Sequence, residues 1–218
     1  MEVLNLKNLV IYGAGGFGRE VAWLVERINN NHHEWNLLGF IDDVKTEMYG
    51  KPINGLNVLG GREWFDANRN GIYVTCAMGK SQSRRKIYSS LEMLSHVKLA
   101  TLVDPSVLLA DTSSISEGSI VCCGSRIMTN AKLGKGVVVN TGSSVGHDSE
   151  LGDYCTLFVN AMVSGTVKVG ESTEIGSGAF VLEYKTVGKD IVIAPLSSVL
   201  ADITVSGTYA GNPARRIR

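Results

Sequence analysis

The chain has 218 residues, with 21 basic and 21 acidic side chains and a formal net charge of zero at pH 7. This balance gives no general attraction to nucleic acid or to an anionic membrane, so neither is expected as a partner. No stretch approaches the ~18 uninterrupted apolar residues of a membrane-spanning helix, and the first residues lack a secretory pattern. We therefore expect a cytoplasmic protein without membrane insertion.

Residues 1–95 alternate short apolar runs with segments of helical periodicity. We expect strands over 9–12, 37–41 and 72–76, and helices over 19–28, 62–68 and 81–94. Ser81 or Ser83 would cap the last helix, and residues 97–103 would be a strand or a connector. Strands that alternate with helices predict a small parallel, Rossmann-like α/β domain over residues 1–95.

A glycine-rich turn joins the first strand to the first helix. Gly13, Gly15 and Gly18 spell G-x-G-x-x-G, a pattern for which an NAD site is the first candidate. About 95 residues are too few for two mononucleotide-binding halves, so a single nucleotide diphosphate is favoured over NAD. Its phosphates would lie at the N-terminus of the helix that starts near Gly16, with Asp42 or Asp43 near the uridine or its ribose.

Every sixth residue from Val103 to Val205 is aliphatic, through eighteen successive positions. The residue four places later is small or β-branched, with Lys185 the only departure among seventeen. This period is typical of a hexapeptide parallel β-helix. We expect six coils of three hexads, roughly 29 Å long, with the α/β domain over one open end and residues 206–218 over the other. Several glycines are expected to turn corners at positive φ: Gly134, Gly136, Gly152, Gly170, Gly176 and Gly188.

The repeat has no insertion that could wall a pocket. A smooth prism has no concave site, so binding would need a partner surface, most simply a second subunit. The sequence offers few side chains that could bind a metal, because the four cysteines form no CxxC pair and only four histidines are present. The adjacent Cys122 and Cys123 have poor geometry for a mutual disulfide, and Cys155 falls on an inward position.

His147 is the only histidine of the repeat and occupies a non-core position. An imidazole titrates near neutrality, which suits a general base. Asp148 and Glu150 could orient the ring or raise its basicity. The residues alone leave two interpretations open, a catalytic base and an ordinary surface histidine.

Three segments carry a resemblance to a known family. The hexad array, the Gly146-His147-Asp148 segment and the ending 210–215 resemble the hexapeptide-repeat acyltransferases. Residues 11–18 and 40–43 narrow the resemblance to the sugar O- and N-acetyltransferases that act on bacillosamine precursors, perosamine or sialic acid. It covers nearly the whole chain and implies an α/β Rossmann-like domain followed by an all-β left-handed parallel β-helix over 96–218, with a C-terminal cap.

The resemblance implies an acetyl-CoA-dependent N-acetyltransferase without a metal. The acceptor would be a nucleotide-linked, UDP-type 4-amino-4,6-dideoxy sugar, and a homotrimer would form the active sites between subunits. The amine would attack the thioester directly, because no cysteine or serine is evidently poised as a nucleophile. An O-acetyltransferase of the sialic acid type and a non-catalytic β-helix that binds or supports other molecules are the alternatives.

Site residues follow from the same resemblance. His147 would be the base and Asp148 its acidic neighbour, Asn140 would contact the substrate one coil away, and the Gly165 N–H would hold the oxyanion. The nucleotide-sugar site is expected at Gly13, Ala14, Gly15, Asp42, Asp43 and Gly60. The acetyl-CoA site is expected at Thr156, Gly165, Ser177, Gly178, Ala194 and Pro195.

Two departures from the family pattern bear on these roles. Phe17 stands where the family usually has a histidine, which removes one sugar or phosphate contact. Pro195 has no N–H, so a coenzyme contact there would use its carbonyl or its ring. Of the three arginines in the tail, Arg215, Arg216 and Arg218, at least one would lie near a coenzyme phosphate unless the tail is simply solvated.

Overall fold

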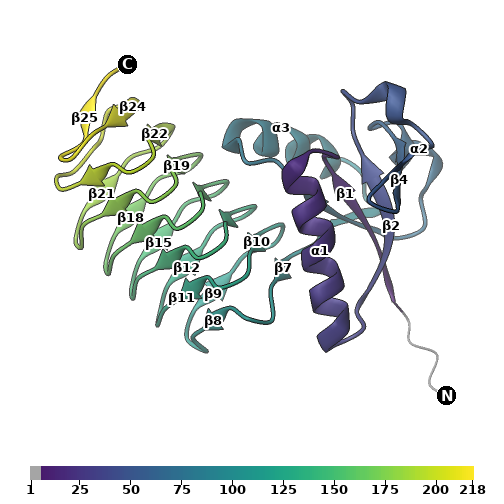
Figure 1. Cartoon of the computed structure of the whole chain (residues 1–218), viewed down its shortest axis with the longest axis horizontal. Helices are drawn as coiled ribbons and strands as arrows, with labels where there is room; N and C mark the ends of the chain where they lie inside the picture. Colours follow the sequence, from purple (N-terminus) through teal and green to yellow (C-terminus); the bar gives the residue numbers. More distant parts are fainter. Residues whose placement is uncertain (1–5) are drawn as a thin grey trace.

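The computed structural model describes residues 6–218 and consists of an α/β part followed by a β-helix (Figure 1). The α/β part contains β1 (Lys7–Tyr12), α1 (Gly16–Asn31), β2 (Trp35–Ile41), η1 (Thr46–Met48), β3 (Pro52–Ile53), β4 (Leu56–Gly60), α2 (Trp64–Ala67), β5 (Ile72–Cys76), α3 (Ser81–Leu91) and β6 (Val97–Leu99). The expected alternation of strands and helices is confirmed. Helix α1 starts three residues earlier than its apolar pattern indicates, at Gly16.

The strand order of the first sheet is β3-β4-β2-β1-β5-β6. All neighbours are parallel except β3 and β4. Because the chain moves from β1 to β2 on one side and β5 lies on the other, the order reverses beside β1. Ligands of open parallel sheets bind outside the carboxyl ends of the strands at such a reversal.

The second part is a left-handed parallel β-helix of short strands. These are β7 (Leu102–Val103), β8 (Leu108–Leu109), β9 (Ser114–Ile115), β10 (Ile120–Val121), β11 (Arg126–Ile127), β12 (Lys132–Leu133), β13 (Val138–Val139), β14 (Ser144–Val145), β15 (Glu150–Leu151), β16 (Thr156–Leu157), β17 (Met162–Val163), β18 (Lys168–Val169), β19 (Glu174–Ile175), β20 (Phe180–Val181), β21 (Thr186–Val187), β22 (Ile191–Ile193), β23 (Ser198–Val199), β24 (Gly207–Ala210) and β25 (Arg215–Arg216). Every third strand pairs, as β10 pairs with β13 through Ile120 and Val138. Three hexads therefore make one coil, as predicted.

The prism has three faces. The first face runs from β7 through β10, β13, β16, β19 and β22 to β24 and β25; the second is β8-β11-β14-β17-β20-β23; the third is β9-β12-β15-β18-β21. The predicted inward aliphatic positions are buried without interruption from Val121 to Val199. At the two ends of the prism the inward positions are exposed to solvent, since Leu109 is 44% and Val205 56% exposed.

The α/β part does not cover the open end of the prism, contrary to expectation. It packs on the outside of the first face, where Leu102, Ile120 and Val138 share one buried cluster with Leu9 and Leu24. The reason is that these outward positions are apolar on this face, so burying them against α1 and β1 removes them from water. The tail does fold over the last coil as expected, and Tyr209 and Ala214 join the prism core.

Corners at positive φ recur every six residues, but mostly not at the predicted glycines. Among the six glycines named for this role, only Gly136 has a positive φ. At four of the others the next coil leaves no room for a side chain: a Cβ at Gly152 would lie 2.7 Å from the Glu171 nitrogen, whereas one at Gly188 would lie 3.2 Å from its nearest neighbour. The left-handed corners include bulkier residues, among them Asp148 at φ 58°. Throughout residues 6–218, no helix is long and apolar enough to cross a membrane.

Candidate active site

His147 follows β14 at the edge between the second and third faces, here called the histidine edge (His147, Asp148, Gly165, Thr166 and Tyr184). Its Nδ1 lies 2.8 Å from Asp148 Oδ2, and Asp148 Oδ1 accepts a hydrogen bond of 2.9 Å from the Asn130 amide. The Asn130 amide, and after it His147, hold the pKa of Asp148 below its ordinary value. An ionised carboxylate has no proton to give, so Nδ1 donates and a neutral ring keeps its lone pair on Nε2.

Gly165 lies one coil beyond His147 on the same edge. A Cβ added there would collide with the imidazole Nε2, so only glycine leaves room for the ring. The Gly165 N–H donates to no backbone acceptor within residues 6–218, although the Gly165 carbonyl accepts from the Tyr184 N–H. The histidine edge therefore combines an exposed imidazole nitrogen with an unused backbone donor.

Asn140 follows β13 at the edge between the first and second faces, here called the asparagine edge (Asn140, Thr141, Phe158, Ser177, Gly178, Ala194, Pro195 and Leu196). It lies in the same coil as His147, at the other end of β14, and not one coil away as expected. Its Oδ1 accepts a hydrogen bond of 2.7 Å from the Thr141 N–H. Within one chain, the second face therefore separates Asn140 from His147.

The residues expected at acetyl-CoA divide between different places. Ser177, Gly178, Ala194 and Pro195 all lie on the asparagine edge, in the coils that follow Asn140. Gly165 belongs to the histidine edge. Thr156 does not fit: it is fully buried beneath the α/β part, and its hydroxyl is occupied by the Gly79 carbonyl at 2.8 Å. The resemblance could not reveal this burial, because it depends on how α3 packs.

Two exposed residues of these edges were missed by the sequence analysis. Leu196 on the asparagine edge is 80% and Tyr184 on the histidine edge 71% exposed. Both have φ near 60°, a conformation that is costly for bulky side chains. The signal was present in the hexads, since both occupy the corner position where, apart from the buried Tyr154, only Gly, Asn, Asp, Ser or Thr has a positive φ. Strained, exposed apolar residues of this kind are candidates for ligand contact.

The predicted nucleotide-site residues do come together at the carboxyl ends of β1, β2 and β4. The Ala14 N–H donates to Asp42 Oδ2 at 2.8 Å, and the Asp42 N–H donates to the Gly60 carbonyl at 3.0 Å. Asp42 is buried and also accepts from the N–H groups of Val44 and Lys45. Its carboxylate thus shapes the loop. The exposed Asp43 remains the more accessible acid, although it holds the Tyr12 hydroxyl.

The N-terminus of α1 is open for an anion. Gly15 is the N-cap and makes no side-chain capping bond, and the first turn carries no acidic residue. The first N–H groups of a helix attract phosphate when nothing caps them. Gly18 is needed because a Cβ there would collide with the Gly13 carbonyl. Phe17 is partly buried and packs against the neighbouring apolar cluster.

The loop between β5 and α3 joins this region to the prism. A Cβ on Gly79 would lie 3.2 Å from the Phe158 ring, so the loop contacts the asparagine edge. Neither Ser81 nor Ser83 caps α3. The N-cap residue is Lys80, and the Ser81 N–H donates to Glu174 Oε1 of the prism at 2.9 Å. A carboxylate from the other part of the chain therefore occupies this helix terminus.

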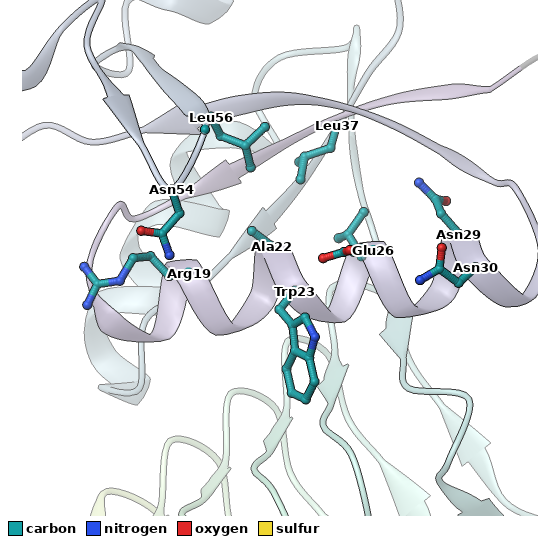
Figure 2. A pocket seen from close by; sticks show the side chains of 11 residues that line it. Arg19, Ala22, Trp23, Glu26, Asn29, Asn30, Leu37, Asn54 and Leu56 are labelled. Atoms are coloured by element: carbon teal, nitrogen blue, oxygen red, sulfur yellow. The ribbon is translucent and has the colours of Figure 1, made fainter.

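A cavity of about 630 Å³ lies beside α1 (Figure 2). Arg19, Glu26 and Asn30 line it together with Asn54 and Leu56 of the β3–β4 hairpin. None of the predicted site residues contributes to it. In residues 6–218, no group of three or more His, Cys, Asp or Glu side chains could hold a metal ion.

Comparison with known proteins finds relatives that match both the α/β part and the β-helix. Residues 8–91 match the PglD N-terminal domain. The chain is 29% identical to GDP-perosamine N-acetyltransferase of Escherichia coli O157:H7 over 215 residues, 95% of each protein. It is 29% identical to the acetyltransferase domain of PglB from Neisseria gonorrhoeae FA1090, solved in complex with acetyl coenzyme A, with 97% and 100% coverage and a TM-score of 0.89. WeeI from Acinetobacter baumannii AYE is 28% identical over 97% of this chain and 100% of that one, with a TM-score of 0.87.

Proposed function

Because the chain belongs to the hexapeptide-repeat acetyltransferases of sugars, we propose that it acetylates the 4-amine of a UDP-linked 4-amino-4,6-dideoxy sugar. Acetyl-CoA is the cosubstrate. The observation that carries the proposal is the histidine edge, where an imidazole held by Asp148 packs beside Gly165, whose N–H donates to no backbone acceptor. The similarity to GDP-perosamine N-acetyltransferase supports an amino-sugar acceptor.

Direct transfer follows from these groups. The sugar amine attacks the thioester carbonyl and forms a C–N bond, while His147 Nε2 takes a proton from the nitrogen. The Gly165 N–H stabilises the oxyanion of the tetrahedral intermediate. The C–S bond then breaks, and the imidazolium returns its proton to the coenzyme A thiolate. The products are the N-acetyl sugar and free coenzyme A.

The outer surfaces of the prism favour a homotrimer that buries the second face. The first face is covered by the α/β part, and the third carries the charged row Lys132, Glu150 and Lys168. Large apolar side chains are exposed on the second face and its edges: Leu108, Met128, Val159, Met162 and Leu200. Exposed apolar area of this kind marks interaction sites. Packing this face on a neighbour would bring one subunit's histidine edge to the next subunit's asparagine edge.

A charge on this face tests the trimer. Met162→Asp would place a carboxylate in the interface, so we expect the trimer to dissociate and activity to fall with it. Thr186→Asp, on the charged third face, is the matched control and should leave a trimer. Light scattering after size-exclusion chromatography measures both. A trimeric, active Met162→Asp protein would contradict this interface.

The acceptor end of the site would be the open N-terminus of α1. The pyrophosphate would contact the N–H groups that follow Gly15, and Asp43 would contact the nucleoside. The β5–α3 loop contacts Phe158, so the sugar would extend from there onto the asparagine edge. On that edge, the peptides around Ser177 and Ala194 would line the pantetheine arm.

Release of the coenzyme A thiol with a panel of acceptors tests the proposed reaction. UDP-, dTDP- and GDP-linked 4-amino-4,6-dideoxy sugars, the free sugars and sialic acid would each be supplied with acetyl-CoA. We expect fastest release with the UDP-linked amine. Turnover with GDP-linked amines alone would overturn the choice of UDP, and turnover with hydroxyl acceptors alone would overturn N-acetylation.

A further inference from the structure

One face of α3 contacts four successive coils of the prism. The Tyr88 hydroxyl donates to the Gly118 carbonyl at 2.9 Å, and Arg84 Nε donates to the Gly136 carbonyl at 2.6 Å. Arg84 Nη2 reaches the Tyr154 carbonyl at 2.7 Å, and the Ser81 hydroxyl the Ser172 carbonyl at 3.0 Å. The four carbonyls belong to equivalent corners, 18 residues apart.

The match between the two elements has a simple physical basis. A turn of α-helix advances about 5.4 Å, and neighbouring strands lie about 4.8 Å apart. Side chains spaced three or four residues apart on one side of a helix therefore meet equivalent corners of successive coils. Each corner residue has a positive φ, as at Gly118 and Tyr154. The helix is thus aligned in register with the prism.

Arg84 is the central residue of this contact. Its side chain is fully buried. All its hydrogen-bond acceptors in residues 6–218 are carbonyl or hydroxyl oxygens, none a carboxylate. Two of them, the carbonyls of Met78 and Gly79, belong to the loop after β5, while the rest belong to the prism. Burying a cation that has no hydrogen-bonded carboxylate costs free energy of folding. Stability alone therefore does not explain this arrangement.

The loop that Arg84 holds lies between the two halves of the proposed acceptor site. On one side, a Cβ on Gly13 would lie 3.1 Å from the Ala77 carbonyl, so the loop adjoins the glycine-rich turn. On the other side, Gly79 contacts Phe158 of the asparagine edge. A shift of α3 by a fraction of one coil would therefore change the distance from the nucleotide to the reacting amine.

We propose that Arg84 is a positioning residue that sets the nucleotide end of the α/β sheet at a fixed distance from the asparagine edge. The nucleotide of the acceptor accelerates transfer only because this distance is fixed. The inference rests on the proposed nucleotide-linked acceptor. Misplacement by about 1 Å can cost about 10²-fold in rate, so a small shift is sufficient.

The test compares one amino sugar with and without its nucleotide. For wild type, kcat/KM should be larger with the nucleotide-linked sugar, and the ratio of the two values measures the contribution of the nucleotide. Arg84→Lys keeps the charge but cannot reach all the carbonyls. We expect this ratio to fall about 10- to 100-fold, while kcat/KM for the free sugar and KM for acetyl-CoA change less than about twofold. Lys86→Ala, on the exposed side of α3, should match wild type.

A second variant keeps the test decisive if Arg84→Lys does not fold. Tyr88→Phe removes the hydroxyl that donates to the Gly118 carbonyl and accepts from the Cys76 N–H, and should lower the same ratio by a smaller factor. An equal fall for both sugars, or an unchanged ratio in folded protein, would overturn the positioning role. A wild type that shows no preference for the nucleotide-linked sugar would instead overturn the proposed acceptor, and the inference with it.

Discussion

The α/β part and the β-helix present their functional groups in opposite ways. In the α/β part the Asp42 carboxylate accepts hydrogen bonds from three backbone N–H groups, and the uncapped donors are the N–H groups at the N-terminus of α1. In the β-helix the strand backbones pair from coil to coil, and the free group is a side chain, His147, 59% exposed. One part is thus suited to hold an anion and the other to move a proton.

Removing the imidazole gives the largest effect expected for the β-helix. His147→Ala should lower kcat about 10²- to 10⁴-fold, because a positioned general base typically contributes this much. The side chain is mainly in solvent, so the fold should persist. Steady-state thiol release and circular dichroism measure the two quantities. Wild-type turnover in a folded His147→Ala protein would show that His147 is not the general base.

Gly165→Ala examines the same region through the backbone. The added methyl group would displace the ring at Nε2, and we expect a loss of about 10²-fold in kcat with little change in stability. The double variant His147→Ala/Gly165→Ala is the control. If the methyl acts through the imidazole, it should add almost nothing to the effect of His147→Ala. Additive losses would place the role of Gly165 elsewhere.

Gly15→Asp tests the anion site of the α/β part. No atom lies within 4 Å of a Cβ at Gly15, and Asp is a favoured N-cap, so α1 should be unharmed or stabilised. Its carboxylate would repel a phosphate, and KM for the nucleotide-linked sugar should rise about 10- to 100-fold. Gly15→Asn is the neutral control and should change KM much less. Equal effects of Asp and Asn would argue against a phosphate at this terminus.

Asp148→Asn gives the smallest change and shifts the pH dependence. The lowered pKa of Asp148 keeps its carboxylate ionised wherever an imidazole titrates. An ionised carboxylate favours the protonated ring, while catalysis needs the neutral ring. Removing the charge should move the acid limb of kcat/KM to lower pH and reduce the plateau about tenfold. A limb that moves to higher pH would contradict this arrangement.

What the sequence could predict differs between the two parts for physical reasons. The hexad pattern predicted the coils because an inward position repeats at each strand, and G-x-G-x-x-G predicted a turn in which Gly13 and Gly18 are sterically required. The burial of Thr156 and the capping of α3 by Glu174 depend on contacts between residues far apart in the chain. A period of six is identical on all three faces, so it could not show which face α3 covers.

In the proposed trimer, one subunit holds the nucleotide while its neighbour supplies the base, and mixed trimers test this arrangement. His147→Ala subunits keep the anion site and Gly15→Asp subunits keep the base. With the nucleotide-linked sugar well below the wild-type KM, each protein alone should have little activity. If the site lies between subunits, random trimers from equal amounts should recover about a quarter of wild-type activity. If each subunit uses its own base and its own nucleotide, the mixture will stay as inactive as its components.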